Sequence, residues 1–149
     1  MSTKSKLEND LKEAMRARDD VKKRTLRMAI SAIKLAEIDK QQTLDESALL
    51  AILQKEIKTR QETISEAQRG RREELVAEAE AEIEVLKVYL PKPLTRQELE
   101  ELVRKVIEEV GATSMADMGQ VMKTLTPRLE GRATGGEASQ VVRQMIQQG

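Results

Sequence analysis

Apolar side chains recur with the helical period through most of the chain. Leu7 and Leu11 lie four positions apart and are followed by two more apolar residues at helical spacing, which is typical of one face of an α-helix. The pattern predicts a first helix over about residues 3–17. Asp19 is a favourable capping residue, and the apolar positions after it predict a second helix that runs to about residue 39.

Two longer helices are expected next. The segment from Thr43 to Glu46 has the form of a capping box and predicts the start of a third helix. Gly70 is expected to end it. A fourth helical segment follows at once, so the two should pair as a long antiparallel hairpin. Their apolar seams comprise Leu49, Leu53, Ile57 and Ile64 in the third helix, and Leu75, Ala79, Ile83, Leu86 and Leu90 in the fourth.

Pro91 and Pro93 interrupt this helical pattern. Proline fixes φ and disfavours helix at the residue before it. We therefore predict an N-terminal domain over residues 1–92 and a small C-terminal domain over residues 93–149. The C-terminal domain should hold helices from the Thr95 capping box to Gly111, from Ser114 to about Leu125, and from about Glu137 to Gln148, with a turn after Pro127.

Composition supports an all-α fold. The chain has 149 residues, of which 39% are hydrophobic and only 1% aromatic. Its core must therefore come from Leu, Ile, Val, Met and Ala, a mixture that favours helices. We expect a two-domain, multihelical protein with a long antiparallel helical hairpin in the first domain and a three-helix type of second domain.

Several classes of chemistry are excluded by the residues that are missing. The sequence contains no Cys and no His, which removes thiol nucleophiles, imidazole bases and the usual zinc sites. Ser31 and Lys34 match an S-x-x-K pattern, but Ser31 falls in the middle of a predicted helix. We expect no cofactor, no metal and no catalytic activity of the chain by itself.

Neither a secretory signal nor a membrane span is recognisable. The longest apolar run covers residues 48–53, whereas a membrane span needs about 20 residues. We expect a cytoplasmic protein without membrane contact. Net charge is zero, from 26 basic and 26 acidic residues, so a nucleic-acid surface would need local clustering of cations.

Two such clusters lie in the predicted N-terminal domain. The second helix carries a basic stripe that could bind phosphate or pair with the Glu-rich fourth helix. A basic amphipathic membrane helix is a third interpretation, which the absence of Trp and Phe disfavours. Three arginines surround Gly70 at the expected hairpin tip. They could contact phosphate or simply form a solvated turn that complements a helix C-terminus. The stripe consists of Lys23, Arg27 and Lys34, and the tip of Arg69, Arg71 and Arg72.

The candidate that ranks first is the loop before the last helix, ahead of the α2 stripe and the hairpin tip. A glycine-containing loop that enters a helix N-terminus can bind an anion, although a plain loop and helix cap is the alternative. The loop contains Gly131, Gly135 and Gly136, and the basic residues near it in sequence are Lys123, Arg128 and Arg132.

Five stretches carry a family pattern: Leu26–Lys34, Leu53–Lys58, Tyr89–Lys92, Asp117–Lys123 and Gly131–Ala133. They resemble the YqeY family, whose members are stand-alone relatives of the tail domain of GatB, one of the subunits of the tRNA-dependent amidotransferase. The chain departs from the family pattern at Thr134, where the family often has Asp; Thr can also cap a helix, slightly less well.

This resemblance implies a tRNA-binding or amidotransferase-associated accessory protein that lacks the catalytic module of GatB. The resemblance also implies a family-level label of carbon–nitrogen ligase activity with glutamine as the nitrogen donor, which is inherited from GatB. Expected partners are tRNA, and aminoacyl-tRNA or the amidotransferase machinery. Because Tyr89 is the one aromatic residue, RNA would be recognised by its duplex shape and phosphates rather than by base stacking. The alternative is a protein–protein adaptor that docks through its helical hairpin.

Overall fold

The computed structural model describes residues 2–148, and this part of the chain is helical with no strand. The prediction of an all-α fold is confirmed. The elements are α1 (Thr3–Ala17), α2 (Asp20–Lys40), α3 (Glu46–Arg69), α4 (Glu73–Lys87), α5 (Arg96–Val110), a short 3-10 turn η1 (Met115–Asp117), α6 (Met118–Leu129) and α7 (Gly135–Gln148).

The chain forms two compact units, Met1–Leu90 and Pro91–Gly149. We call them unit 1 and unit 2 and describe each by itself. The helices α1 to α4 belong to unit 1, and the remaining elements belong to unit 2. That each unit folds alone as a domain, as the sequence suggests, stays a prediction.

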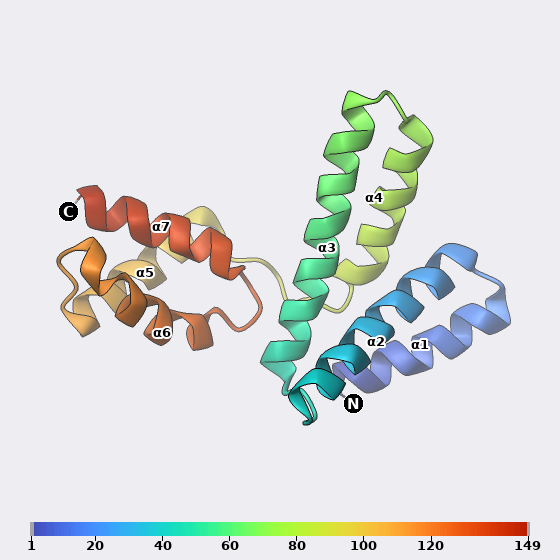
Figure 1. Cartoon of the computed structure of the whole chain (residues 1–149), viewed down its shortest axis with the longest axis horizontal. Coiled ribbons are helices and arrows are strands. Elements are labelled where there is room, and N and C mark those ends of the chain that lie inside the picture. Colours follow the sequence, from blue (N-terminus) through green and yellow to red (C-terminus); the bar gives the residue numbers. More distant parts are fainter. Residues whose placement is uncertain (1, 149) are drawn as a thin grey trace. The chain divides into compact units, whose positions relative to one another are not determined.

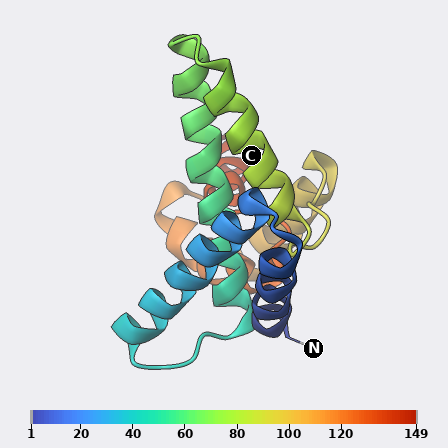
Figure 2. The same ribbon diagram turned by 90° about the vertical axis from the view of Figure 1, so that its right-hand side faces the viewer.

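In unit 1, α3 and α4 run side by side as a long hairpin (Figures 1 and 2). Helix α2 is central, because it packs against α1, α3 and α4. Its buried face consists of aliphatic side chains and Thr25, whose hydroxyl donates to the Val21 carbonyl oxygen at 2.7 Å. The core of the unit comprises Leu7, Leu26, Ala29, Ile30, Ile33, Leu49, Leu50, Leu53, Ile57, Ile83 and Leu86.

The start of α3 differs from the sequence-based prediction. Asp45, not Thr43, caps the helix, and its carboxylate accepts the Ala48 backbone N–H at 2.8 Å. Asp is a stronger N-cap than Thr, and Asp45 stands at the position that reaches the third helical residue. The Thr43 capping box is therefore wrong by two residues.

The turn between α3 and α4 also differs in detail. Gly70 ends α3 as expected, but its φ is −85°. The left-handed residue is Arg71, with φ of 56°. A non-glycine residue in this region has a small conformational cost. The backbone of Arg71, rather than that of Gly70, therefore adopts the left-handed conformation in this turn.

Unit 2 is a three-helix bundle with an aliphatic core. Its first helix begins with the predicted capping box, in which Thr95 and Glu98 each accept the backbone N–H of the other. Gly111 ends this helix in the left-handed conformation with φ of 69°. The core comprises Leu99, Val103, Val106, Val121, Leu125, Leu129, Ala133, Ala138, Val141 and Val142.

The last two helices differ from the prediction at their ends: α6 begins and ends four residues later, after the 3-10 turn η1, and α7 begins two residues earlier. Helix α6 passes through Pro127 and ends at Leu129. The proline ring lacks the N–H that would bond the carbonyl four residues earlier, yet buried Leu125 and Leu129 hold this turn on the core. Helix α7 begins at Gly135, after Thr134 caps it by accepting the Glu137 N–H at 3.1 Å. Gly135 and Gly136 therefore lie in the helix rather than in the loop.

Candidate nucleic-acid interface

In unit 2, Arg128 is held by an acid of a neighbouring helix. Its guanidinium donates two hydrogen bonds to the Glu109 carboxylate, at 2.6 and 3.1 Å. This contact lowers the pKa of Glu109 and raises that of Arg128. Such forked pairs are among the stronger polar contacts. A phosphate would have to displace Glu109 in order to bind Arg128.

Arg132 has a structural contact as well. Its Nε donates to the Lys92 carbonyl oxygen at 2.8 Å, and its guanidinium lies 3.7 Å from the Glu98 carboxylate. The Arg132 carbonyl oxygen accepts the Leu94 N–H at 2.8 Å. Together these bonds attach the segment that precedes α5 to the loop between α6 and α7. Local sequence does not predict this contact, because Arg132 and Lys92 lie 40 residues apart.

Lys123 is exposed and faces away from Arg128. The two residues are five positions apart on α6, which corresponds to about 140° around a helix. Thr134 already engages the N–H groups of Glu137 and Ala138 at the start of α7. The structure therefore does not bring the cations of unit 2 together at this helix N-terminus. Gly131 has φ of 76°, so the loop needs a residue here that tolerates the left-handed region, and glycine does so without strain.

One sequence-based interpretation is that the α2 stripe pairs with the Glu-rich helix α4. Within the described residues, the structure does not have this pairing for Lys23, Arg27 or Lys34. The cation that pairs with α4 is Arg24, which lies 2.8 Å from Glu78 and 3.2 Å from Glu82. Of the stripe itself, Lys23 lies 3.8 Å from Asp20. Arg27 approaches the Met15 sulfur at 3.9 Å, and Lys34 is exposed.

Arg60 is a buried cation in the apolar seam of α3, between Ile57 and Ile64. An arginine in such a seam ordinarily extends its head into solvent, but Arg60 does not. Instead, its side chain is only 7% exposed, and its Nε donates to Glu82 at 2.8 Å. It also donates to the Glu56 carbonyl oxygen at 3.0 Å and approaches the Met28 sulfur at 3.7 Å. Arg60 thus joins α2, α3 and α4 through polar contacts.

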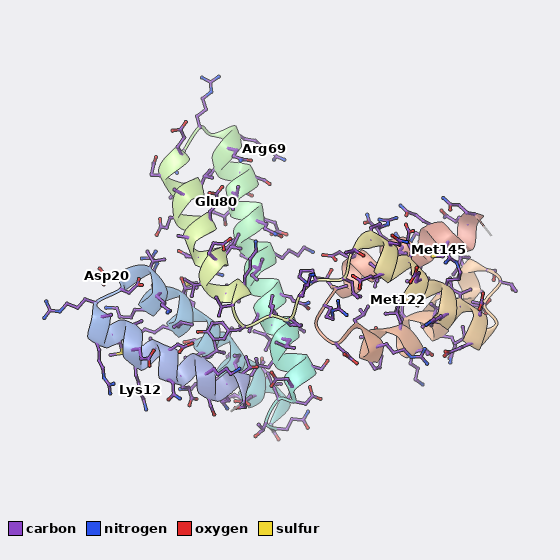
Figure 3. The ribbon with its side chains drawn as sticks, turned by 180° about the vertical axis from the view of Figure 1, so that it is seen from behind. Lys12, Asp20, Arg69, Glu80, Met122 and Met145 are labelled. Atoms are coloured by element: carbon purple, nitrogen blue, oxygen red, sulfur yellow. The ribbon has the colours of Figure 1, made fainter. Side chains whose placement is uncertain are left out.

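The hairpin tip has a different electrostatic character. Arg69, Arg71 and Arg72 are all exposed, and Figure 3 shows Arg69 at the end of the hairpin. Within residues 2–148, none of the three takes part in an ion pair. Their positive charge is therefore available to an anionic partner.

Tyr89 is engaged inside unit 1. Its hydroxyl donates to the Asp10 carboxylate, and burial together with this bond raises the tyrosine pKa well above its ordinary value. The ring borders a shallow depression between α1, α2 and α4, which is lined by Asp10, Lys22, Glu84, Val85, Val88 and Tyr89.

The described residues form neither a metal site nor a membrane span. No group of three or more acidic, His or Cys side chains among them is placed to hold a metal ion. No described helix combines the length and the apolar character that crossing a bilayer requires.

The chain is similar to proteins named "Altered inheritance of mitochondria protein 41, mitochondrial". The one from Vanderwaltozyma polyspora is 38% identical over 119 residues, which cover 75% of this chain and 64% of that protein. The one from Lachancea thermotolerans is 46% identical over 85 residues, 56% of this chain and 46% of that protein. The chain thus spans about half to two thirds of the length of these relatives.

These relatives contradict the expectation of a cytoplasmic location, because their names place them in mitochondria. That expectation was wrong in its reasoning as well. It rested on the absence of a recognisable secretory signal or membrane span, and neither absence distinguishes the cytoplasm from an organelle interior.

The family comparison covers almost the whole molecule. The family model described as "Yqey-like protein" matches residues 4–146, which include both units and every helix but the ends of the first and last. The stretches that suggested this family from the sequence lie in α2, α3, the segment before α5, α6 and the loop before α7. The chain therefore belongs to the YqeY family.

Proposed function

We propose that this YqeY-family protein is an accessory factor that binds tRNA through phosphate contacts and has no catalytic module of its own. The observation that carries the proposal is the hairpin tip, where three exposed arginines have no acidic partner in the described part of the chain. Arginine forms forked hydrogen bonds to phosphate. A protein of zero net charge needs such a local cluster to attract RNA.

The state of Tyr89 supports recognition of phosphates rather than bases. A base stacks on an exposed aromatic face, but the one aromatic ring of this sequence is half-buried and its hydroxyl is bonded to Asp10. Duplex RNA is recognised mainly by shape and by phosphate and 2′-hydroxyl contacts. The folded, largely duplex structure of tRNA fits this mode.

Unit 2 supports the choice of tRNA through its resemblance to the tail of the amidotransferase subunit. Its exposed Lys123 can add a phosphate contact, whereas Arg128 and Arg132 must first leave Glu109 and the Lys92 carbonyl oxygen. We place unit 2 second to the hairpin tip for this reason. Association with the amidotransferase machinery is part of the same proposal.

A salt titration of tRNA binding tests the proposal. In duplex DNA, the logarithm of the binding constant falls by about 0.9 per neutralised phosphate for each logarithmic unit of salt. The triple variant R69A/R71A/R72A should therefore flatten the slope by roughly 2 to 3 and weaken different tRNAs alike, because phosphate contacts carry no sequence information.

The matched control is K123A/R128A/R132A, which removes the same charge from unit 2. We expect this control to change the slope by about one, from Lys123 alone. Equal slopes for the wild type and the tip variant would contradict the role of the tip. No tRNA binding by the wild type at low salt would reject the function as a whole.

A further inference from the structure

The exposed face of α2 carries large apolar side chains. Met28 is 50% exposed, Leu35 61% and Ile38 71%. At about 100° per residue they lie within an arc of about 80°, and Arg27 and Lys34 border this arc on one side. No acidic residue occurs from residue 21 to residue 36. Buried positions on the opposite face explain the packing of α2. On the exposed face, Met28 approaches Arg60 of α3 at 3.7 Å and Arg27 approaches Met15 of α1 at 3.9 Å, but Leu35 and Ile38 in the C-terminal half remain largely exposed.

Helix α4 has a complementary exposed face. Glu73, Glu80 and Glu84 lie on one edge of it, and Ala77, Ala81 and Val88 lie beside them within an arc of about 100°. All six are exposed, and Val88 is 78% exposed. Figure 3 shows Glu80 on this helix. Within residues 2–148, Glu73 and Glu80 have no ion-pair partner, and Glu84 has only a 3.5 Å contact with Lys87.

We propose that α2 of one molecule docks on α4 of a second copy of this chain. The two faces match when the helices run antiparallel. In that orientation the basic edge of α2 (Arg27 and Lys34) meets the acidic edge of α4 (Glu80 and Glu84). The apolar edge formed by Met28 and Leu35 then meets the small side chains Ala77 and Ala81, which permit close approach of the two helices.

Unit 1 already contains one contact of this kind. Arg24, which lies toward the N-terminal end of this same face of α2, pairs with Glu78 and Glu82 of α4 within the same molecule. The chain also has zero net charge, which lowers the repulsion between copies. A phosphate backbone would match the cations of α2 but not the apolar side chains beside them, so a protein helix is the better occupant. The α2 face is separate from the hairpin tip of the proposed function.

Reciprocal charge reversal in the full-length protein tests this docking. By sedimentation or light scattering, the wild type should self-associate reversibly at concentrations on the order of 100 µM, and less so in about 0.5 M salt. The double variants R27E/K34E and E80K/E84K should each weaken association about tenfold or more. An equimolar mixture of the two should associate again, because each supplies the charge that the other has lost.

The control K55E/K58E makes the same change in net charge as R27E/K34E, but on an exposed face of α3. It should associate like the wild type. Leu35→Ser should weaken association without changing any charge. A wild type that stays monomeric over this range overturns the proposal and leaves an acidic helix of another protein as the occupant. Failure of the mixed variants to associate also overturns it, while circular dichroism of each variant checks that the helices are intact.

Discussion

The two units use their cations in opposite ways. In unit 1 an arginine is buried against Glu82, and the three arginines of the hairpin tip have no acidic partner in the described part of the chain. In unit 2 the described buried side chains are all hydrophobic, and Arg128 and Arg132 lie at the surface in contact with Glu109 and Glu98. Clusters of arginines that look similar in the sequence thus differ in the folded protein in whether an acidic side chain pairs with them.

This difference shows that a basic residue is a candidate contact only after its neighbours are known. Glu109 lies 19 residues from Arg128, so the ion pair depends on the packing of α5 against α6. The hairpin tip projects from the bundle, where no other helix of unit 1 can supply an acid (Figure 1). The sequence ranked the cluster of unit 2 above the hairpin tip as a phosphate site, and the contacts in the fold favour the tip instead.

The largest effect should come from the buried arginine. We expect Arg60→Ala to lower the free energy of unfolding of unit 1 by about 2 to 3 kcal/mol, because the poorly solvated Glu82 then keeps only the more exposed Arg24 as its partner. Chemical denaturation followed by far-UV circular dichroism measures this change. Lys58→Ala, on the exposed side of the same helix, should stay within about 0.5 kcal/mol of the wild type. A similarly small loss for Arg60→Ala would show that the ion pair does not support the unit.

An intermediate effect should appear when the surface pair of unit 2 is titrated. Arg128 holds the pKa of Glu109 below its ordinary value of 4.5. The stabilisation that this carboxylate contributes is therefore fully present above pH 4.5 and is lost as the pH falls through its lower folded-state pKa.

The melting temperature of unit 2, measured from pH 7 to pH 3 in the wild type and in Glu109→Gln, should show this difference. The variant should be less stable at neutral pH, and the two curves should converge in acid. Parallel curves over the whole range would mean that the Arg128–Glu109 contact does not form in solution.

The smallest effect is expected from separating the units. A fragment of residues 91–149 keeps the bonds of Arg132 to Lys92 and Leu94, together with the whole aliphatic core of unit 2. Its melting temperature should match that of unit 2 in the full chain. A shorter fragment that begins at Thr95 loses those bonds and should melt lower. An unfolded 91–149 fragment would contradict the two-domain prediction.

The sequence by itself determined the helical architecture, because this information is local. The 3.6-residue period of Leu, Ile and Val marked the buried faces, and Thr95 with Glu98 and Gly111 marked the ends of α5 through short-range bonds. The prediction failed where a second signal overrode the one that was used, either a neighbouring capping residue or a contact with the core. Asp45 rather than Thr43 capped α3, and the core contacts of Leu129 carried α6 through Pro127.

Only the tertiary structure decided which charged residues are available. Arg60 lies in an apolar seam, where an arginine ordinarily extends its head into solvent, yet contacts from α2 and α4 keep it buried beside Glu82. Arg132 has the context of an anion-binding loop, yet a carbonyl oxygen 40 residues away accepts its hydrogen bond. The Coulomb energy of a charge depends on its spatial neighbours and on its exposure to water, and both are set by the packing of helices that are distant in sequence.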